Sequence, residues 1–406
     1  MFRLVIRYLL RSRNNFPINK YTTMKYIIIL TIILTSGFTK MKTVSTNKEY
    51  IYVGTYNEED MPGIFVFEFN RKEGSMSLVQ EVGGMGSPSY LEINPSGDYL
   101  YSVNRSSVVP DKKWGSVSSY KIDQEKGTLS HINDQPTQGS ESCHVSLDSK
   151  GRLVFVSNYS TGNLSVFPVL KDGSLGQFSD TEQHTGHSIN ESRQKKPHVH
   201  QSIVSPNDRF LYVSDLGIDK VKVYSIDFGQ NTLTELPDSD GLVEKGSGPR
   251  HFTVHKNQKF AYVINEMAST VTAFKIDAGN GQLTPFQTIS SIPKDFNDVN
   301  YCADIHIDPS GQYLYGSNRG HNSLVIFKID QDSGVLSNVG FQSTYGEWPR
   351  NFLIDPKGQF IFVANQNSDN IVLFRRDSES GKLSKIKDEI IVPKPVCLKI
   401  LETDGN

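Results

Sequence analysis

The sequence is short of cysteine, on which small cross-linked domains depend, and it has no excess of positive charge, on which nucleic-acid-binding proteins depend. Its 406 residues include three cysteines, Cys143, Cys302 and Cys397, and no Cys-x-x-Cys pair. This odd number without metal-ligand spacing excludes a zinc site and a disulfide framework, so we expect three small buried hydrophobic side chains. A formal net charge of −2 provides no overall field for nucleic acid or an anionic membrane.

An apolar run near the N-terminus is too short to cross a bilayer comfortably. Tyr26 to Leu34 follows Met24-Lys25 and precedes small and polar residues up to Gly37, which is the layout of a secretory signal. No cysteine follows it, so a lipid anchor is not indicated. We expect a periplasmic or secreted protein without stable membrane insertion, or a cytoplasmic one if the segment is not a working signal. The expected divisions are an over-called start at 1–23, a signal peptide at 24–37 and a linker at 38–48.

A short turn-like pattern recurs seven times along the rest of the chain. Each copy has an acidic or polar residue, a few polar residues that usually include glycine, and then an aliphatic residue. The aliphatic residues lie about fifty residues apart at Met76, Leu129, Leu175, Leu233, Leu283, Leu336 and Leu383. A period of this length indicates an array of similar units.

Each unit contains short alternating runs of β-branched and aromatic residues between turn residues, such as Phe210 to Ser214 and Val221 to Ile226. Such runs predict strands joined in hairpins, and four antiparallel strands per unit are typical of a propeller blade. We therefore predict an all-β, seven-bladed β-propeller over residues 49–403. The segment 395–400 resembles 349–354, so the C-terminal strand is expected to join the first blade and close the ring.

One face of this propeller is predicted to collect the chemically active residues. The start of the first strand and the end of the second strand of every blade lie on that face, around the central channel. The first strands bring the pairs Ser89-Tyr90, Cys143-His144, His200-Gln201, Arg250-His251, Ala303-Asp304, Arg350-Asn351 and Val396-Cys397. The second strands bring Tyr56, Arg105, Tyr159, Leu216, Glu266, Arg319 and Gln366. Each residue alone could be structural, but their convergence favours a site.

Several motifs at these positions resemble the lactonase family of seven-bladed propellers, which includes bacterial 6-phosphogluconolactonases and is related to carboxymuconate-lactonising cyclases. The resemblance covers about Tyr50 to Leu401. The motifs are Pro197-His-Val-His200, Val213 to Val221, Gly246-Ser-Gly-Pro-Arg-His251, Val263-Ile-Asn-Glu266, Gly316 to His321, Pro349-Arg-Asn-Phe352 and Val363 to Asn370. Tryptophan-rich WD-type propellers look different, because only Trp114 and Trp348 occur here.

The resemblance implies a site formed by His200, Arg250, Glu266 and Arg319, with no metal and no cofactor. His200 or Glu266 would activate water, and Arg250 would stabilise the oxyanion. The expected substrate-binding residues are His144, His198, His251, Arg319 and Arg350, with the two arginines holding a phosphate or carboxylate. We expect hydrolysis of a small-molecule sugar lactone, by default 6-phospho-D-glucono-1,5-lactone, by a monomer that binds no nucleic acid.

Three alternatives stay open at this point. The same groups could catalyse lactonisation, as in the cyclases, or the chain could be a ligand-binding propeller without catalysis. A calcium-dependent lactonase would use oxygen ligands from Asn158, Asn265, Asn318 and Glu266. The asparagines are otherwise expected to satisfy backbone groups at strand ends. A phosphorylated sugar lactone is intracellular, so an export signal would favour a substrate without phosphate.

Overall fold

The computed structural model describes residues 48–57, 61–106 and 114–403. The expected start at 1–23, the signal-like segment 24–37 and all of the linker except Lys48 lie outside the described residues. Within the described part of the chain, no helix is both long and apolar enough to cross a bilayer.

Seven antiparallel sheets form the blades, and the strands are given from the inner to the outer one. Blade 1 contains β29 (Pro395–Glu402), β1 (Glu49–Thr55), β2 (Ile64–Asn70) and β3 (Ser75–Val82). Blade 2 contains β4 (Gly86–Ile93), β5 (Tyr99–Ser106), β6 (Ser116–Ile122) and β7 (Leu129–Pro136). Blade 3 contains β8 (Ser142–Leu147), β9 (Leu153–Asn158), β10 (Asn163–Pro168) and β11 (Asp180–Gln183).

The remaining blades follow the same order. Blade 4 contains β12 (Val199–Val204), β13 (Phe210–Asp215), β14 (Lys220–Asp227) and β15 (Thr232–Glu235), with the 3-10 turn η1 (Pro237–Ser239) and the short β16 (Gly241–Leu242) beside β14. Blade 5 contains β17 (Pro249–Val254), β18 (Phe260–Asn265), β19 (Thr270–Ile276) and β20 (Leu283–Ser290). Blade 6 contains β21 (Tyr301–Ile307), β22 (Tyr313–Arg319), β23 (Ser323–Ile329) and β24 (Leu336–Ser343). Blade 7 contains β25 (Pro349–Ile354), β26 (Phe360–Asn365), β27 (Asn370–Arg376) and β28 (Leu383–Ile391).

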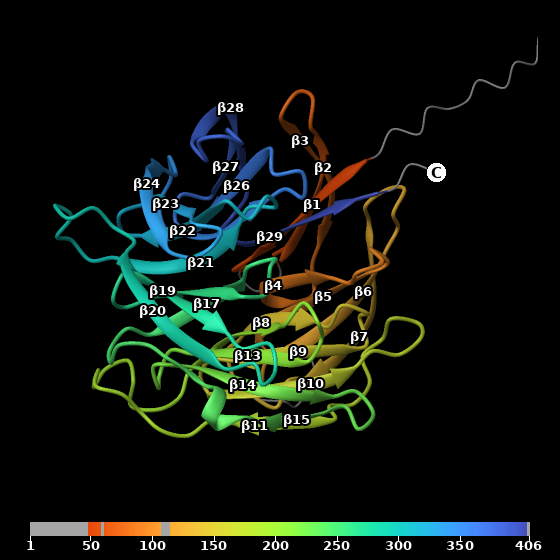
Figure 1. The fold of residues 1–406 in the computed structure, drawn as a ribbon. Coiled ribbons are helices and arrows are strands. Elements are labelled where there is room, and N and C mark those ends of the chain that lie inside the picture. Colours follow the sequence, from red (N-terminus) through yellow and green to blue (C-terminus); the bar gives the residue numbers. More distant parts are fainter. Residues whose placement is uncertain (1–47, 58–60, 107–113, 404–406) are drawn as a thin grey trace, which may run out of the picture. The chain divides into compact units, whose positions relative to one another are not determined.

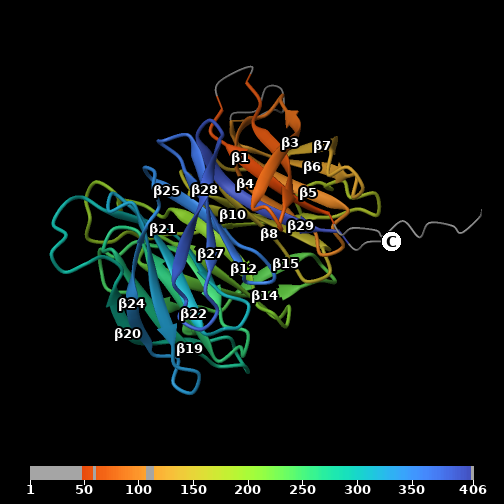
Figure 2. The ribbon, with the colours of Figure 1, turned by 90° about the horizontal axis from the view of Figure 1, so that it is seen from above.

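The inner strands contact one another in ring order, from β29 through β4, β8, β12, β17, β21 and β25 back to β29. The blades are therefore arranged around one axis (Figure 1). The predicted closure is confirmed, because β29 pairs antiparallel with β1 and places Ile400 opposite Ile51. In Figure 1 and Figure 2 the blue strands from the end of the chain lie among the orange strands from its beginning.

The core lies between neighbouring blades because the second and third strands are apolar on both sides. Every residue of β13, for example, is buried. One cluster joins blades 4 and 5 through residues such as Tyr212, Phe252 and Phe274. Such β-branched and aromatic side chains fit a pleated surface that is covered on both faces. The outer strands, such as β20, consist mostly of partly buried and exposed residues.

The recurring turns connect neighbouring blades through a tyrosine. Tyr315 Oη donates a hydrogen bond of 2.6 Å to the carbonyl oxygen of Gly381, in the outer turn of the next blade. The same contact joins Tyr52 to Gly127, Tyr101 to Gly173 and Tyr262 to Gly334. Gly381 has a φ of 69°, and a Cβ there would lie 2.4 Å from the ring of Tyr313. The glycine of the repeated pattern is thus required by the packing between blades.

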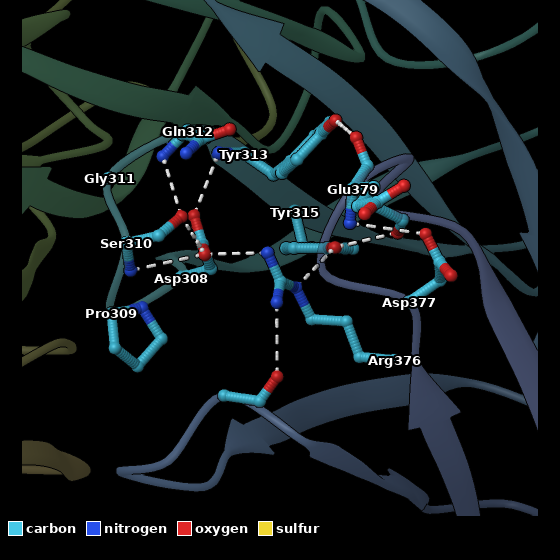
Figure 3. Close-up of polar contacts among 12 residues, drawn as sticks. Asp308, Pro309, Ser310, Gly311, Gln312, Tyr313, Tyr315, Arg376, Asp377 and Glu379 are labelled. Carbon is cyan, nitrogen blue, oxygen red and sulfur yellow. Dashed lines mark hydrogen bonds and ion pairs between the residues drawn. The ribbon is translucent and has the colours of Figure 1, made fainter.

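A buried ion pair reinforces this junction between blades 6 and 7. Figure 3 shows the guanidinium of Arg376 between Asp308 and Tyr315. Arg376 Nη2 lies 2.6 Å from Asp308 Oδ2, and its Nε donates to Tyr315 Oη at 2.9 Å. Since Asp308 lies in the turn between β21 and β22, this cluster is at the face opposite the predicted site. It is a structural cluster, because its groups are satisfied by one another.

Candidate functional site

The predicted convergence of strand ends produces a cavity of about 320 Å³ at one face of the propeller. Seven residues of the predicted face line it: Arg105, Cys143, Tyr159, His200, Glu266, Arg319 and Arg350. The register explains their meeting, because the start of each inner strand pairs with the end of the next strand. Tyr301 of β21, for example, lies opposite Arg319 of β22.

A β-bulge recurs at the start of the inner strands and directs side chains of this face. In β12, Val199 pairs with Asp215 and Gln201 pairs with Ser214, so His200 is the extra residue. The extra residues in four other blades are Ser89, Cys143, Arg250 and Arg350. Bulges change the direction of one side chain without disturbing the rest of the ladder, and they are common beside active sites.

Glu266 is the centre of an arginine cluster. It follows β18 directly and accepts hydrogen bonds from Arg193 Nη2 at 2.6 Å, Arg319 Nη2 at 2.9 Å and Arg250 Nε at 3.0 Å. Burial by itself would raise the pKa of the carboxyl, but the three guanidinium groups lower it to about 2. Glu266 is therefore a carboxylate that fixes cations, and its basicity is weak.

Arg250 lies behind Glu266 and does not line the cavity. Its side chain is 2% exposed, and Nη1 donates to the carbonyl oxygen of Ala303. Burial, followed by Arg319 and Arg350, lowers the pKa of Arg250, yet a guanidinium stays charged at neutral pH. This geometry favours positioning of Glu266 by Arg250, whereas the predicted contact with an oxyanion is untested.

His200 lines the cavity, and one edge of its imidazole ring is buried. Its ring is 5.7 Å from that of Tyr159, and Nδ1 is buried without a hydrogen-bond partner among the described residues. Burial, with the charges of Arg250 and other arginines, lowers the pKa of His200 well below its usual value. The imidazole is therefore neutral at pH 7 and carries a free lone pair, which a general base requires.

The other predicted histidines lie outside the cavity wall. His144 and His251 are both buried, and their ring centroids are 5.7 Å apart. His198 stacks on Tyr159 at 4.4 Å, and its Nδ1 is 3.0 Å from the Tyr159 carbonyl oxygen. Burial lowers the pKa of His198. Direct substrate binding by these three histidines remains a prediction, and for His198 the structure favours support of Tyr159.

Arg350 is a guanidinium in the cavity wall that is not engaged by a carboxylate. It makes no hydrogen bond or ion pair with any residue that the structure describes, and its charge lies 5.1 Å from the centroid of Tyr56. Arg105 lies 5.1 Å from the same centroid and donates to Tyr56 Oη at 3.0 Å. Arg105 also forms an ion pair with Glu141. Two cations thus share one tyrosine ring on the side of blades 1, 2 and 7.

Four wall residues were missed by the sequence alignment of the blades: Glu141, Arg193, Tyr301 and Trp348. Arg193 comes from the segment between β11 and β12, outside the strands that were aligned. Glu141, Tyr301 and Trp348 each lie two residues before an aligned position, so a wider window at each strand start would have included them. Trp348 lies 5.3 Å below the guanidinium of Arg319 and supplies an apolar wall.

The cysteines and two of the three asparagines behave as predicted from the sequence, whereas Asn265 donates to the hydroxyls of Thr270 and Thr272 and its Oδ1 is buried without a partner among the described residues. All three cysteines are free and buried, and burial raises the pKa of Cys143 to about 12, so it is a neutral thiol. Asn158 and Asn318 donate from Nδ2 to the backbone carbonyl oxygens of Thr137 and Ser291. Among the described residues, no group of three or more His, Cys, Asp or Glu side chains is arranged to hold a metal ion.

Known proteins resemble this chain over most of its length. A family model described as "Lactonase, 7-bladed beta-propeller" matches residues 50–400. A Bacillus subtilis protein named 6-phosphogluconolactonase is 37% identical over 350 residues, which cover 86% of this chain and 97% of the relative. A Formosa agariphila protein of the same name is 40% identical over 307 residues, covering 74% and 85%. The solved structure of a periplasmic gluconolactonase from Pseudomonas aeruginosa superposes with a TM-score of 0.82 at 34% identity, covering 87% and 99%.

Proposed function

The chain belongs to the family of seven-bladed β-propeller lactonases, and on that basis we propose that it hydrolyses a sugar lactone at the cavity of His200 and Glu266. The default substrate is 6-phospho-D-glucono-1,5-lactone, with 6-phosphogluconate as the product. The two relatives named 6-phosphogluconolactonase support this substrate, and the periplasmic gluconolactonase supports the same ring opening without a phosphate.

His200 is the proposed general base. It lines the cavity, is neutral at pH 7 and can accept a proton from water as the water oxygen attacks the ester carbonyl carbon. Glu266 is the weaker candidate, because three arginines already occupy its oxygens and lower its pKa to about 2. The proton on His200 is then returned to the ring oxygen as the C–O bond breaks.

Arg319 and Arg193 are the proposed oxyanion donors. Each is held to Glu266 through Nη2, while Nη1 of each donates no hydrogen bond to any described residue. Fixed cations beside the developing charge stabilise the tetrahedral intermediate without reorganisation. This assignment moves the role from Arg250, whose side chain is almost completely buried behind Glu266. Arg250 is instead proposed to hold the Glu266 carboxylate in place.

Arg350 and Arg105 are proposed to bind the anionic group of the substrate. Each lies 5.1 Å from the ring centroid of Tyr56, and Arg350 donates no hydrogen bond to any described residue. Guanidinium groups bind phosphate or carboxylate through paired N–H donors. One observation carries the proposal: a neutral His200 lines the same cavity as arginines whose N–H groups are partly free.

The test compares initial rates with 6-phospho-D-glucono-1,5-lactone and with D-glucono-1,5-lactone, each corrected for spontaneous hydrolysis. We expect rapid turnover by the wild-type chain and a loss of about 10²-fold or more in kcat for His200→Gln. Unchanged turnover in His200→Gln would remove the proposed base. A chain that turns over neither lactone, but binds one at this face, would instead be a ligand-binding propeller.

Export is also proposed, on the signal-like layout of residues 24–37. The propeller would then be the mature domain, and a lactone without phosphate would be the substrate more readily encountered. Cell fractionation of the native protein, combined with N-terminal sequencing, tests this proposal. An intact N-terminus on a protein found only in the cytoplasm would contradict it and would favour the phosphorylated substrate.

A further inference from the structure

A buried carboxylate in blade 4, Asp219, lies outside the cavity wall and takes no part in the proposed chemistry. It belongs to the turn between β13 and β14. Its Oδ2 accepts hydrogen bonds from Ser188 Oγ and, at 2.6 Å, from the N–H of Gly246. Its Oδ1 accepts from Gln194 Nε2 at 2.8 Å and from the N–H of Gly248 at 2.7 Å. A carboxylate suits this position because all four partners donate and an ionised carboxylate only accepts.

Other blades have an equivalent residue in the turn between their second and third strands. Asn322 Oδ1 in blade 6 accepts the N–H of Trp348 at 2.9 Å, and Asp369 Oδ1 in blade 7 accepts the N–H of Lys394 at 2.8 Å. These bonds correspond to the one from Gly248, because each donor stands two residues before the extra residue of its β-bulge. The two bonds from the segment before blade 4 are additional to this repeated contact.

Those two additional bonds fasten the loop that carries Arg193. The N–H of Ser188 donates to the carbonyl oxygen of Gln194 at 3.0 Å, and the N–H of Gln194 donates to the carbonyl oxygen of Asn190 at 2.8 Å. The loop is thus closed on itself, and its two ends are both bonded to Asp219 through side chains. Arg193 precedes Gln194 directly and lies in the cavity wall.

The repeated contact leads from the same carboxylate to Glu266. Gly248 donates its N–H to Asp219, and its carbonyl oxygen accepts the N–H of Glu266 at 2.7 Å. Glu266 Oε1 in turn accepts from Arg193 Nη2 at 2.6 Å. Hydrogen bonds and short stretches of chain therefore form a closed circuit, which returns to Asp219 through Gln194. One buried carboxylate holds both members of the ion pair in the cavity wall.

We propose that Asp219 is a positioning residue, which fixes Arg193 at its place in the cavity by holding Arg193 and Glu266 to one point of blade 4. The proposal rests on the proposed lactone hydrolysis, in which Arg193 is an oxyanion donor. Such a donor must lie at hydrogen-bond distance from the oxyanion, and a misplacement of about 1 Å can cost about 10²-fold in rate. Arg319 depends less on Asp219, because it also donates to backbone carbonyl oxygens of β21.

The first experiment needs no substrate. Trypsin cuts after arginine or lysine where the backbone opens, and Arg193 and Lys195 supply two sites in this loop. Asp219→Asn replaces one acceptor oxygen by an amide donor, so cleavage at these sites is expected to accelerate about tenfold or more. Asp369→Asn, the same change at the equivalent but exposed position of blade 7, is the matched control and should leave this cleavage unchanged. An unchanged rate in Asp219→Asn would overturn the proposal, whatever the substrate.

The second experiment is a double-mutant cycle on turnover of 6-phospho-D-glucono-1,5-lactone. Asp219→Asn is expected to lower kcat about 10- to 100-fold with little change in KM, because an oxyanion donor acts in the transition state. In an Arg193→Met background the same substitution should lower kcat by less than about threefold, since the donor that it positions is already absent. Wild-type kcat in Asp219→Asn, or losses that simply add in the double variant, would overturn the proposal.

Ser188→Ala keeps the proposal testable if Asp219→Asn does not fold. It removes one of the four bonds to the carboxylate and leaves the other three donors in place. We expect a folded variant with faster trypsin cleavage in the loop and kcat lowered about threefold. Wild-type values of both would overturn the proposal. Failure of the wild-type chain to turn over lactones would count against the proposed function, and the trypsin experiment would then decide whether Asp219 holds the loop.

Discussion

Arg193 Nη2 donates a hydrogen bond of 2.6 Å to Glu266 Oε1, across 73 residues of sequence. Arg193 comes from an irregular segment before blade 4, whereas Glu266 follows a regular strand of blade 5. The same guanidinium also donates to Tyr159 Oη of blade 3 at 3.2 Å. One arginine outside the repeat therefore connects blades 3 and 5 at the cavity and completes the positive surroundings of the carboxylate.

Replacement of Glu266 by glutamine is expected to impair both catalysis and stability. Arg193, Arg250 and Arg319 would lose their shared anion, so kcat should fall about 10²-fold. Leaving buried cations unpaired should lower the free energy of unfolding by about 3–5 kcal/mol. Initial rates and urea denaturation measure the two effects, and Glu244→Gln, at an exposed glutamate, is the control. Wild-type kinetics in Glu266→Gln would contradict the assigned arginine anchor.

Arg350→Met should impair turnover of an anionic lactone much more than turnover of a neutral one. Loss of the unengaged guanidinium should lower kcat/KM for the phosphorylated lactone about 10- to 100-fold, chiefly through KM, and should barely affect the unphosphorylated one. Arg375→Met, at an exposed position of β27, is the control for loss of positive charge. Equal losses with both lactones would show that Arg350 does not bind the anionic group.

The stability of the protein should depend on pH through Glu266. Its pKa falls from an ordinary 4.5 to about 2 on folding, so the stabilisation is complete above pH 4.5 and is lost as the pH falls towards 2. Between pH 6 and pH 3 the stability difference between wild type and Glu266→Gln should shrink by about 2 kcal/mol. Urea denaturation at several pH values measures it. A constant difference over this range would contradict the low pKa.

The kcat/KM of the enzyme should stay constant at pH values at which a histidine with an ordinary pKa would already be protonated. Burial and the surrounding arginines lower the pKa of His200, so the neutral base persists as the pH falls below 6.5. We expect kcat/KM to be nearly constant from pH 8 to pH 6 and to decline only under more acidic conditions. A midpoint near pH 6.5 that is absent in His200→Gln would instead indicate a solvated imidazole.

Removal of metal ions should leave the enzyme active. Asn158 Oδ1 accepts a hydrogen bond from Ser142 Oγ, and Asn318 Oδ1 accepts one from Ser291 Oγ. The oxygens of Glu266 accept hydrogen bonds from arginines. Exhaustive dialysis against EDTA should therefore not change kcat/KM. A loss of activity that added Ca²⁺ or Zn²⁺ restores would favour the calcium-dependent alternative or another metal enzyme.

The fold could be predicted because its signals are local and repeated. Each strand is marked by alternating apolar residues and each outer turn by a glycine, and seven similar units must close into a ring to bury their faces. The same alignment predicted the face on which His200, Glu266, Arg319 and Arg350 meet, since strand ends are fixed by the topology.

The alignment could not predict how deeply each side chain is buried beneath that face. Arg250 and Arg350 occupy equivalent bulge positions, yet the first is buried against Glu266 and the second opens into the cavity. The difference comes from the partner that each guanidinium meets. Arg250 meets the carboxylate of Glu266 in its own blade, whereas Arg350 meets the ring of Tyr56 from the neighbouring blade 1. Residues outside the repeat, such as Arg193, have no aligned position from which their contacts could be inferred.

The amino-acid sequence by itself determined the seven blades, the closing strand and the face of the site, because hydrophobic periodicity and turn chemistry act over a few residues. Only the tertiary structure decided which charges are paired and which are free. Ion pairing, burial and the pKa values of Glu266 and His200 depend on groups that are distant in sequence and meet only when the ring closes. Chemistry at this face is therefore a property of the assembled propeller.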